Sequence, residues 1–209
     1  FDSIKDKSFD GAILTGAPIE HLEFEEVEYW RELVEIMQYL RAHCTSTLYL
    51  CWGAMAGLYH FYGIQKLALE KKLFGVFSHE IKHNDVLLTG LGDSVKMPHS
   101  RHSAMNPAHI YAQCKCSKLK ILLEGKKSGI TALKDSKDIF VLGHPEYDKD
   151  TLNTEYERDK EKKLPIKKPQ NYFDKHGKID FSWRADSSVM FSNWLNFCVY
   201  QDTPFVLAK

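Results

Sequence analysis

The stretch from Ser46 to Gly57, S-T-L-Y-L-C-W-G-A-M-A-G, constrains the fold more than any other part of the chain. Its first five residues are β-branched, small or apolar, which predicts a buried strand. Four small residues between positions 53 and 57 then lead into a helical pattern. Cys51 therefore lies where a strand turns sharply into a helix, a turn that lifts one side chain above the sheet. This makes Cys51 a candidate nucleophile, although most cysteines in apolar runs are simply buried.

The order of the remaining elements predicts an α/β fold with a mostly parallel sheet flanked by helices. A short strand at 11–15 precedes a long amphipathic helix expected over 24–43, and the helix after Cys51 should end before Gly63. This β-α-β-α order is typical of parallel sheets. We expect further strands at 73–81, 87–91, 119–124, 130–133 and 139–142, and further helices at 150–162 and 183–200.

Composition narrows the classes of function. Lysine plus arginine and aspartate plus glutamate both number 28, so no basic excess favours nucleic acid or an anionic membrane as partner. No apolar run is long enough to span a bilayer. The five cysteines lack framework spacing, which favours a reducing, cytoplasmic setting. Cys114 and Cys116 form an isolated C-x-C that we interpret as structural, because a closed zinc site needs four ligands.

His144 and Glu146 follow the predicted strand at 139–142 and lie two positions apart. Residues i and i+2 of an extended segment point to the same side, and Pro145 disfavours helical backbone at His144. A carboxylate beside an imidazole fixes the tautomer of the ring and stabilises its protonated form. An isolated H-x-E is a weak signal. Together with Cys51 at the carboxyl edge of a parallel sheet, it predicts a nucleophile, a base and an orienting carboxylate.

The stretch from Pro98 to Ser103 is the other compact polar segment. It contains two histidines and an arginine, and we expect it to be a loop. It is either a loop on the substrate side of a site or a solvated turn, since polarity alone does not separate the two.

Four motifs together resemble the homoserine O-acyltransferases of methionine biosynthesis. They are T-G-A-P-I-E from Thr15, L-C-W-G-A-M-A-G from Leu50, P-H-S-R from Pro98 and G-H-P-E-Y-D from Gly143, and the segment from Phe191 to Phe205 fits the same family. The resemblance covers essentially the whole chain. It implies a flavodoxin-like, class I glutamine amidotransferase-like fold with a Cys-His-Glu triad. It also implies transfer of an acyl group from acetyl-CoA or succinyl-CoA to the γ-hydroxyl of L-homoserine, by a homodimer without a further cofactor.

Carried over to this sequence, the resemblance implies that Cys51 accepts the acyl group, with His144 as base and Glu146 as its partner. It further implies that Lys72 and Ser100 bind substrate and that Arg158 grips the homoserine carboxylate. A guanidinium suits a carboxylate because it offers two parallel donors. The backbone N–H of Trp52, with one from the loop at 16–20, would form the oxyanion hole.

Glu20 bears on the choice of acyl donor. In this family the corresponding residue tends to be glycine in succinyl-transferring members and glutamate in acetyl-transferring ones. A carboxylate on the acyl-binding wall would also repel and crowd the carboxylate of a succinyl group. We therefore expect acetyl-CoA as the donor, with succinyl-CoA as the alternative and a solvated loop acid as the plain reading of Glu20.

Two features depart from the closest superfamily patterns. Tyr49 stands where amidotransferases of the superfamily usually have glycine, which argues against glutamine hydrolysis. Family members also carry a further N-terminal segment with strands of the same sheet, so residues 1–209 are expected to be a single acyltransferase domain lacking those strands. A glutamine amidotransferase, a related cysteine hydrolase and a non-catalytic binding protein of the same fold are the remaining alternatives.

Overall fold

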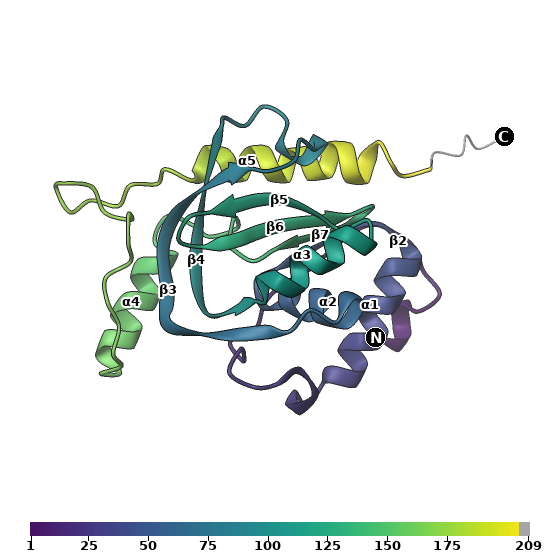
Figure 1. Ribbon diagram of the computed structural model, residues 1–209, viewed down its shortest axis with the longest axis horizontal. Coiled ribbons are helices and arrows are strands. Elements are labelled where there is room, and N and C mark those ends of the chain that lie inside the picture. Colours follow the sequence, from purple (N-terminus) through teal and green to yellow (C-terminus); the bar gives the residue numbers. More distant parts are fainter. Residues whose placement is uncertain (205–209) are drawn as a thin grey trace.

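The computed structural model describes residues 1–204 and contains one seven-stranded sheet with the strand order β1-β2-β7-β6-β5-β3-β4. Helices α1, α2 and α3 lie on one side of the sheet and α5 lies on the other, while α4 stands beside the long β3–β4 hairpin (Figure 1). The strands are β1 (Phe9–Leu14), β2 (Cys44–Leu50), β3 (Lys66–Ile81), β4 (Ser94–Met105), β5 (Lys120–Gly125), β6 (Gly129–Asp135) and β7 (Asp138–Val141). The helices are α1 (Trp30–His43), α2 (Trp52–Tyr62), α3 (Pro107–Cys116), α4 (Thr151–Glu161) and α5 (Arg184–Asn193).

The α/β class with helices on both faces is confirmed, and the sheet itself is mixed. β1 pairs with β2 and β2 with β7 in parallel, whereas the pairs from β7 through β6, β5 and β3 to β4 are antiparallel. The expectation of a mostly parallel sheet therefore holds only for the three strands that carry the candidate nucleophile and base. Short turns join β5 to β6 and β6 to β7, and only antiparallel strands can be joined so tightly.

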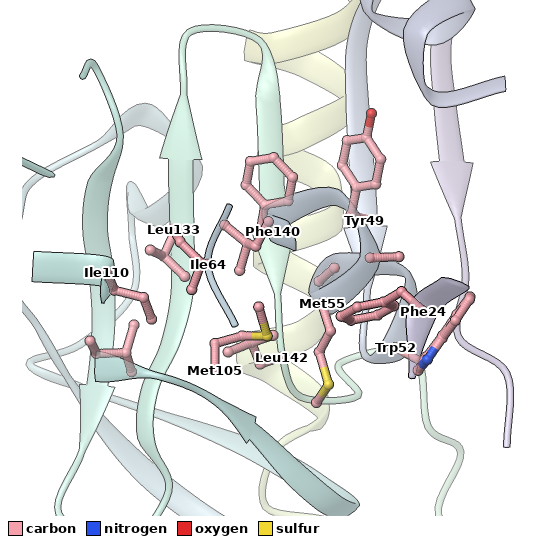
Figure 2. Close-up of a cluster of buried hydrophobic side chains, with 14 of the residues drawn as sticks. Phe24, Tyr49, Trp52, Met55, Ile64, Met105, Ile110, Leu133, Phe140 and Leu142 are labelled. Carbon is pink, nitrogen blue, oxygen red and sulfur yellow. The ribbon is translucent and has the colours of Figure 1, made fainter. Parts of the chain in front are cut away.

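Strands β2 and β7 are buried on both faces, which explains why residues 48–50 and 139–141 are apolar without interruption. Tyr49 and Phe140 point to the side of α2, where their rings stack with centroids 4.9 Å apart (Figure 2). Leu48 and Val141 point to the opposite side, where they pack with Trp194 and its neighbours after α5. The two hydrophobic clusters thus hold β2 and β7 between them, with the carboxyl ends of the two strands side by side.

Several predicted elements have different bounds in the structure. The helix expected over 24–43 is a 3₁₀ turn, η2 (Phe24–Glu26), followed by α1, and the helix expected over 183–200 is α5 followed by a π-helical segment, η4 (Trp194–Tyr200). A further 3₁₀ turn, η1 (Asp2–Ile4), begins the chain. α3 was not expected, although Asn106 caps it and Pro107 occupies its first turn, which is a common start signal.

Two segments form a different type of secondary structure from the one predicted. The strand expected at 87–91 is a 3₁₀ turn, η3 (Val86–Leu88), because the Asp85 carboxylate accepts the Leu87 N–H at 3.0 Å. The loop expected at 98–103 is the middle of β4, where Ser100 pairs with Phe74 of β3. Its polar residues serve both faces of the strand, so they do not show the apolar alternation that marks a half-buried strand.

Candidate active site

Cys51 occupies the strained turn between β2 and α2 that the sequence predicted. Its φ of 48° lies in the left-handed region, which non-glycine residues rarely adopt outside functional turns. The turn is held by the Cys51 N–H, which donates to the Val141 carbonyl of β7 at 2.8 Å. Gly53 is required beneath it, because a Cβ there would lie 2.6 Å from the Leu14 carbonyl oxygen. The small residues therefore let the end of β1 close in under the cysteine.

A cavity of about 730 Å³ opens where β1, β2 and β7 end. It is lined by residues of the turn, of β3 and β4, and of α4. All eight residues singled out in the sequence line it: Glu20, Cys51, Trp52, Lys72, Ser100, His144, Glu146 and Arg158. Their roles stay predictions, but the structure brings them together from six separate segments of the chain.

His144 is held in the cavity from three directions. Its backbone N–H donates to the Pro98 carbonyl at 2.9 Å, and its ring stacks on Tyr147 with centroids 4.1 Å apart. Its Nδ1–H donates to Glu146 Oε1 at 2.6 Å, which leaves Nε2 free for Cys51. Burial disfavours the imidazolium, but hydrogen bonds with Cys51 and Glu146 raise the pKa of His144 to about 10. The arrangement therefore favours the protonated, imidazolium form of His144 beside Cys51.

The backbone around Cys51 is suited to stabilising an oxyanion. Trp52 begins α2, so its N–H belongs to the first turn, which has no intrahelical acceptor and sits at the positive end of the helix dipole. The loop after β1 approaches it closely, since a Cβ at Gly16 would lie 3.2 Å from the Trp52 nitrogen. Glycine at position 16 thus keeps the loop backbone near the place where a negative oxygen would develop.

The far end of the cavity carries a network centred on Glu155 of α4, which the sequence analysis missed. Glu155 accepts the Tyr147 hydroxyl at 2.8 Å, the Ser100 hydroxyl, and the Lys72 ammonium at 3.5 Å. Lys72 also lies 3.5 Å from Asp159, whose other oxygen takes the Arg158 guanidinium at 2.7 Å. The sequence feature that could have revealed this network is the charged helix predicted at 150–162, which places Glu155 and Asp159 on the same side.

Glu20 projects into the same cavity from the loop after β1. Its Oε1 accepts the His102 N–H at 2.7 Å, and its backbone carbonyl accepts the Lys66 ammonium at 3.0 Å. Within residues 1–204 its Oε2 is buried and has no hydrogen-bond partner. Glu20 is therefore a built part of the cavity wall, which excludes the plain reading of a solvated loop acid.

The remaining cysteines lie away from this cavity. Cys114 and Cys116 are unbonded to each other at the end of α3, and Cys44 and Cys198 are buried in the hydrophobic clusters. Among the residues that the structure describes, no helix is both long and apolar enough to cross a membrane. Phe205, the last residue of the C-terminal motif, lies outside the described residues.

The fold belongs to the glutamine amidotransferase-like class of α/β folds. A glutamine amidotransferase from Thermotoga maritima superposes with a TM-score of 0.67 at 11% identity, covering 88% of this chain and 76% of that one. A glutamine amidotransferase from Methylobacillus flagellatus gives a TM-score of 0.68 at 12% identity, covering 90% and 76% of the two chains. At such low identity the likeness shows the fold alone.

The sequence defines the family within that class. The chain belongs to the homoserine O-succinyltransferase family, whose model matches residues 1–205. It is 52% identical over 206 residues to a homoserine O-acetyltransferase of Campylobacter jejuni strain RM1221, covering 99% of this chain and 69% of that protein. It is 51% identical over 211 residues to a homoserine O-acetyltransferase of Clostridium botulinum strain Eklund 17B, covering 98% and 68%. The family resemblance inferred from the motifs is thus confirmed.

Proposed function

We propose that this chain is a homoserine O-acetyltransferase of methionine biosynthesis, which transfers the acetyl group of acetyl-CoA to the γ-hydroxyl of L-homoserine. The observation that carries the proposal is the meeting of Cys51, His144 and Glu146 in one cavity of a chain half identical to proteins of that name. A nucleophile, a base and an orienting carboxylate are the parts that acyl transfer through a covalent intermediate requires.

In the first half-reaction the Cys51 thiolate attacks the carbonyl carbon of the acetyl-CoA thioester. The Trp52 N–H and an N–H of the loop at 16–20 hold the oxyanion of the tetrahedral intermediate. The bond from the carbonyl carbon to the CoA sulfur breaks, and the CoA thiolate takes the proton of the His144 imidazolium. The products are CoA and an acetyl thioester on Cys51.

In the second half-reaction neutral His144 removes the proton of the homoserine hydroxyl, and the oxygen attacks the acetyl carbon. The bond from that carbon to the Cys51 sulfur breaks, which releases O-acetylhomoserine and restores the thiolate beside the imidazolium. Glu146 keeps Nδ1 protonated through both steps, so that Nε2 carries the transferred proton.

Arg158 and its neighbours are placed to receive the amino-acid part of the acceptor. The Arg158 side chain is about half exposed at the cavity, which leaves guanidinium donors for a carboxylate. Lys72 and Ser100 line the same end and are held there by Glu155. These roles, a homodimeric state, the lack of a further cofactor and a cytoplasmic setting remain predictions.

Glu20 supports acetyl over succinyl transfer. Its buried, unbonded Oε2 lies in the wall of the cavity that Cys51 also lines. A succinyl group would bring a second carboxylate against that wall, with a cost in charge repulsion and in space. The alternative, a homoserine O-succinyltransferase using succinyl-CoA, is supported by the description of the matching family model.

The mass of the protein after exposure to each acyl-CoA tests the proposal. Acetyl-CoA alone should add one acetyl group, located on Cys51 by peptide mapping, and the Cys51→Ala variant should remain unlabelled. Subsequent homoserine should remove the label as O-acetylhomoserine. An enzyme that turns over without any adduct would contradict the covalent scheme, and a higher kcat/KM with succinyl-CoA would contradict the assignment of Glu20.

A further inference from the structure

Tyr147 contacts both ends of the cavity. It lies in the loop after β7, and it lines the cavity together with His144 and Glu155. It belongs to the motif G-H-P-E-Y-D, but neither half-reaction proposed above uses it. Its ring, its hydroxyl and its backbone each make a separate contact, and the three contacts together indicate what the residue does.

The ring of Tyr147 lies flat against the imidazole of His144. The two centroids are 4.1 Å apart and the planes are inclined by 18°. The χ2 torsion of a histidine has a broad minimum, so the single bond from Nδ1–H to Glu146 would leave the imidazole room to swing. A flat neighbour on one face opposes that movement and keeps Nε2 directed to Cys51. The face of a phenol ring also attracts positive charge, which favours the imidazolium.

The hydroxyl of Tyr147 reaches the opposite end of the cavity. It donates to Glu155 Oε1 at 2.8 Å. The other carboxylate oxygen, Oε2, is the one that accepts from Lys72 and Ser100. Burial and the charge of Glu155 raise the pKa of Tyr147, so the phenol keeps the proton that it donates. The bond therefore fixes the plane of the carboxylate with Oε2 turned towards Lys72 and Ser100.

The backbone of Tyr147 is anchored outside the cavity. Its carbonyl accepts the indole N–H of Trp183 at 2.9 Å, and its own N–H donates to the His144 carbonyl at 3.2 Å. Trp183 is 0% exposed and belongs to a hydrophobic cluster with Leu152 and Tyr172, against which the side chain of Tyr147 also packs. Tyr147 is thus a fixed support for the groups that it contacts.

We propose that Tyr147 is a positioning residue that joins the base of the triad to the acceptor end of the cavity. Its ring holds the imidazole of His144 in the orientation that serves Cys51, and its hydroxyl holds Glu155 in the orientation that serves Lys72 and Ser100. The part that concerns the ring needs no substrate. The part that concerns the acceptor rests on the function proposed above.

The pH dependence of Cys51 alkylation by iodoacetamide, located by peptide mapping, tests the ring without substrate. An imidazolium held beside a thiol favours the thiolate, which is the form that is alkylated. In Tyr147→Leu the rate at pH 7 should fall about threefold or more and the profile should move to higher pH, since loss of one stacked aromatic pair changes an equilibrium by about that factor. Tyr147→Phe keeps the ring and should keep the wild-type profile.

Steady-state kinetics of Tyr147→Phe test the hydroxyl. The KM for homoserine should rise about fivefold or more, with a smaller change in kcat, because a hydrogen bond to a carboxylate outside the triad is lost. In the Glu155→Ala background the same substitution should raise the KM no further, since two residues that act through one contact are not additive. An equal rise in both backgrounds would overturn the role of the hydroxyl.

Tyr156 provides matched control variants. Among the described residues it packs against the same hydrophobic cluster without lining the cavity. Tyr156→Phe and Tyr156→Leu should therefore keep the wild-type alkylation profile and the wild-type KM for homoserine, even if they lower stability. If Tyr147→Leu does not fold, Tyr147→Met takes its place, because its unbranched side chain fills more of the space without a ring.

The two readouts separate failure of this proposal from failure of the proposed function. A folded variant that lacks the ring but keeps the wild-type alkylation profile would overturn the role of the ring. A wild-type KM for homoserine in Tyr147→Phe would overturn the role of the hydroxyl. A wild-type protein that does not acetylate homoserine would contradict the proposed function, and the role of the hydroxyl with it, while the alkylation profile would still decide the role of the ring.

Discussion

Opposing physical effects act on the pKa of His144. Burial favours its neutral form, while Cys51 on one ring nitrogen and Glu146 on the other favour the charged form. The contacts with Cys51 and Glu146 outweigh burial, so that the pKa of His144 is raised and the imidazolium is favoured in the cavity. A base with this pKa gives up its proton only when a strong base, such as the departing CoA thiolate, is generated beside it.

This balance predicts how stability depends on pH. The pKa of His144 is raised in the folded state from 6.5 to about 10, so its contribution is complete below 6.5 and is lost as the pH rises towards 10. Between these limits the free energy of unfolding should fall more steeply for wild type than for His144→Gln. Urea titrations across the window measure the difference, with the exposed His176→Gln as control. Equal slopes for wild type and His144→Gln would contradict the assignment.

At the scale of elements, α4 contributes a single carboxylate that organises one end of the cavity. Glu155 accepts donors from β3, from β4 and from the loop after β7. Its position on the inner side of α4 lets one helix align side chains from three other segments. Lys72 of β3 and Ser100 of β4, whose substrate-binding roles are predictions, are thus both held by one residue of α4.

Glu155→Gln should therefore weaken binding of the acceptor more than it slows chemistry. The amide loses one of the two negative charges that hold Lys72, the other being Asp159, and replaces one acceptor oxygen with a donor. We expect the KM for homoserine to rise about tenfold, with a smaller change in kcat, because a charge-assisted hydrogen bond is lost outside the triad. Steady-state kinetics check this, with Glu157→Gln on the outer side of the same helix as control. An unchanged KM would show that Lys72 and Ser100 do not depend on α4.

The elements around the site differ in how well sequence could predict them. β2, α2 and β7 have strong apolar patterns, and α2 ends at Gly63 in the left-handed conformation, as expected. The middle of β4 was misread because polar side chains occupy both of its faces: Ser100 and His102 line the cavity, whereas His99 and Arg101 are buried. Arg101 was consequently seen only as part of a polar motif. Its burial depends on β3 pairing across the sheet, which local pattern does not specify.

The direction in which the strands pair was the second feature of the fold that the sequence did not predict. The order of elements up to α2 is typical of a parallel sheet, and the strands that follow extend it in antiparallel fashion. The short turn at 126–128 between β5 and β6 was the available signal, since parallel neighbours need a long crossover. Cys51 and His144 could still be placed correctly, because β2 and β7 pair in parallel and their carboxyl ends lie together.

At the scale of the whole molecule, the two edges of the sheet serve different purposes. The carboxyl edge of β1, β2 and β7 holds the cavity, whereas the amino edge holds a polar cluster in which Arg41 of α1 binds Asp138 at 2.6 Å. Arg41 also donates to the Tyr62 hydroxyl at 3.1 Å and lies over the Phe61 ring. The cluster joins α1, the end of α2 and the start of β7. It therefore holds these helices against the sheet at the edge opposite the cavity.

Arg41→Met should accordingly reduce stability without reducing activity at a temperature where the variant is folded. Asp138 is 2% exposed, so removal of its partner leaves a buried carboxylate uncompensated. Breaking such a pair costs about 3–5 kcal/mol when both groups are buried, and because Arg41 is 35% exposed we expect about 2–3 kcal/mol in urea unfolding. Burial already raises the pKa of Asp138 and Arg41 opposes that shift, so its loss should raise the pKa further.

The sign of the pH effect separates this mechanism from a simple packing defect. The ionised carboxylate is the costly form, so protonation of Asp138 on acidification should remove part of the cost, and the gap between variant and wild type should narrow from pH 7 to pH 5. The double variant Arg41→Met with Asp138→Asn should recover stability at pH 7 for the same reason. A gap that is independent of pH would contradict the role of the buried carboxylate, and a loss of kcat in the folded variant would show that the two edges are not independent.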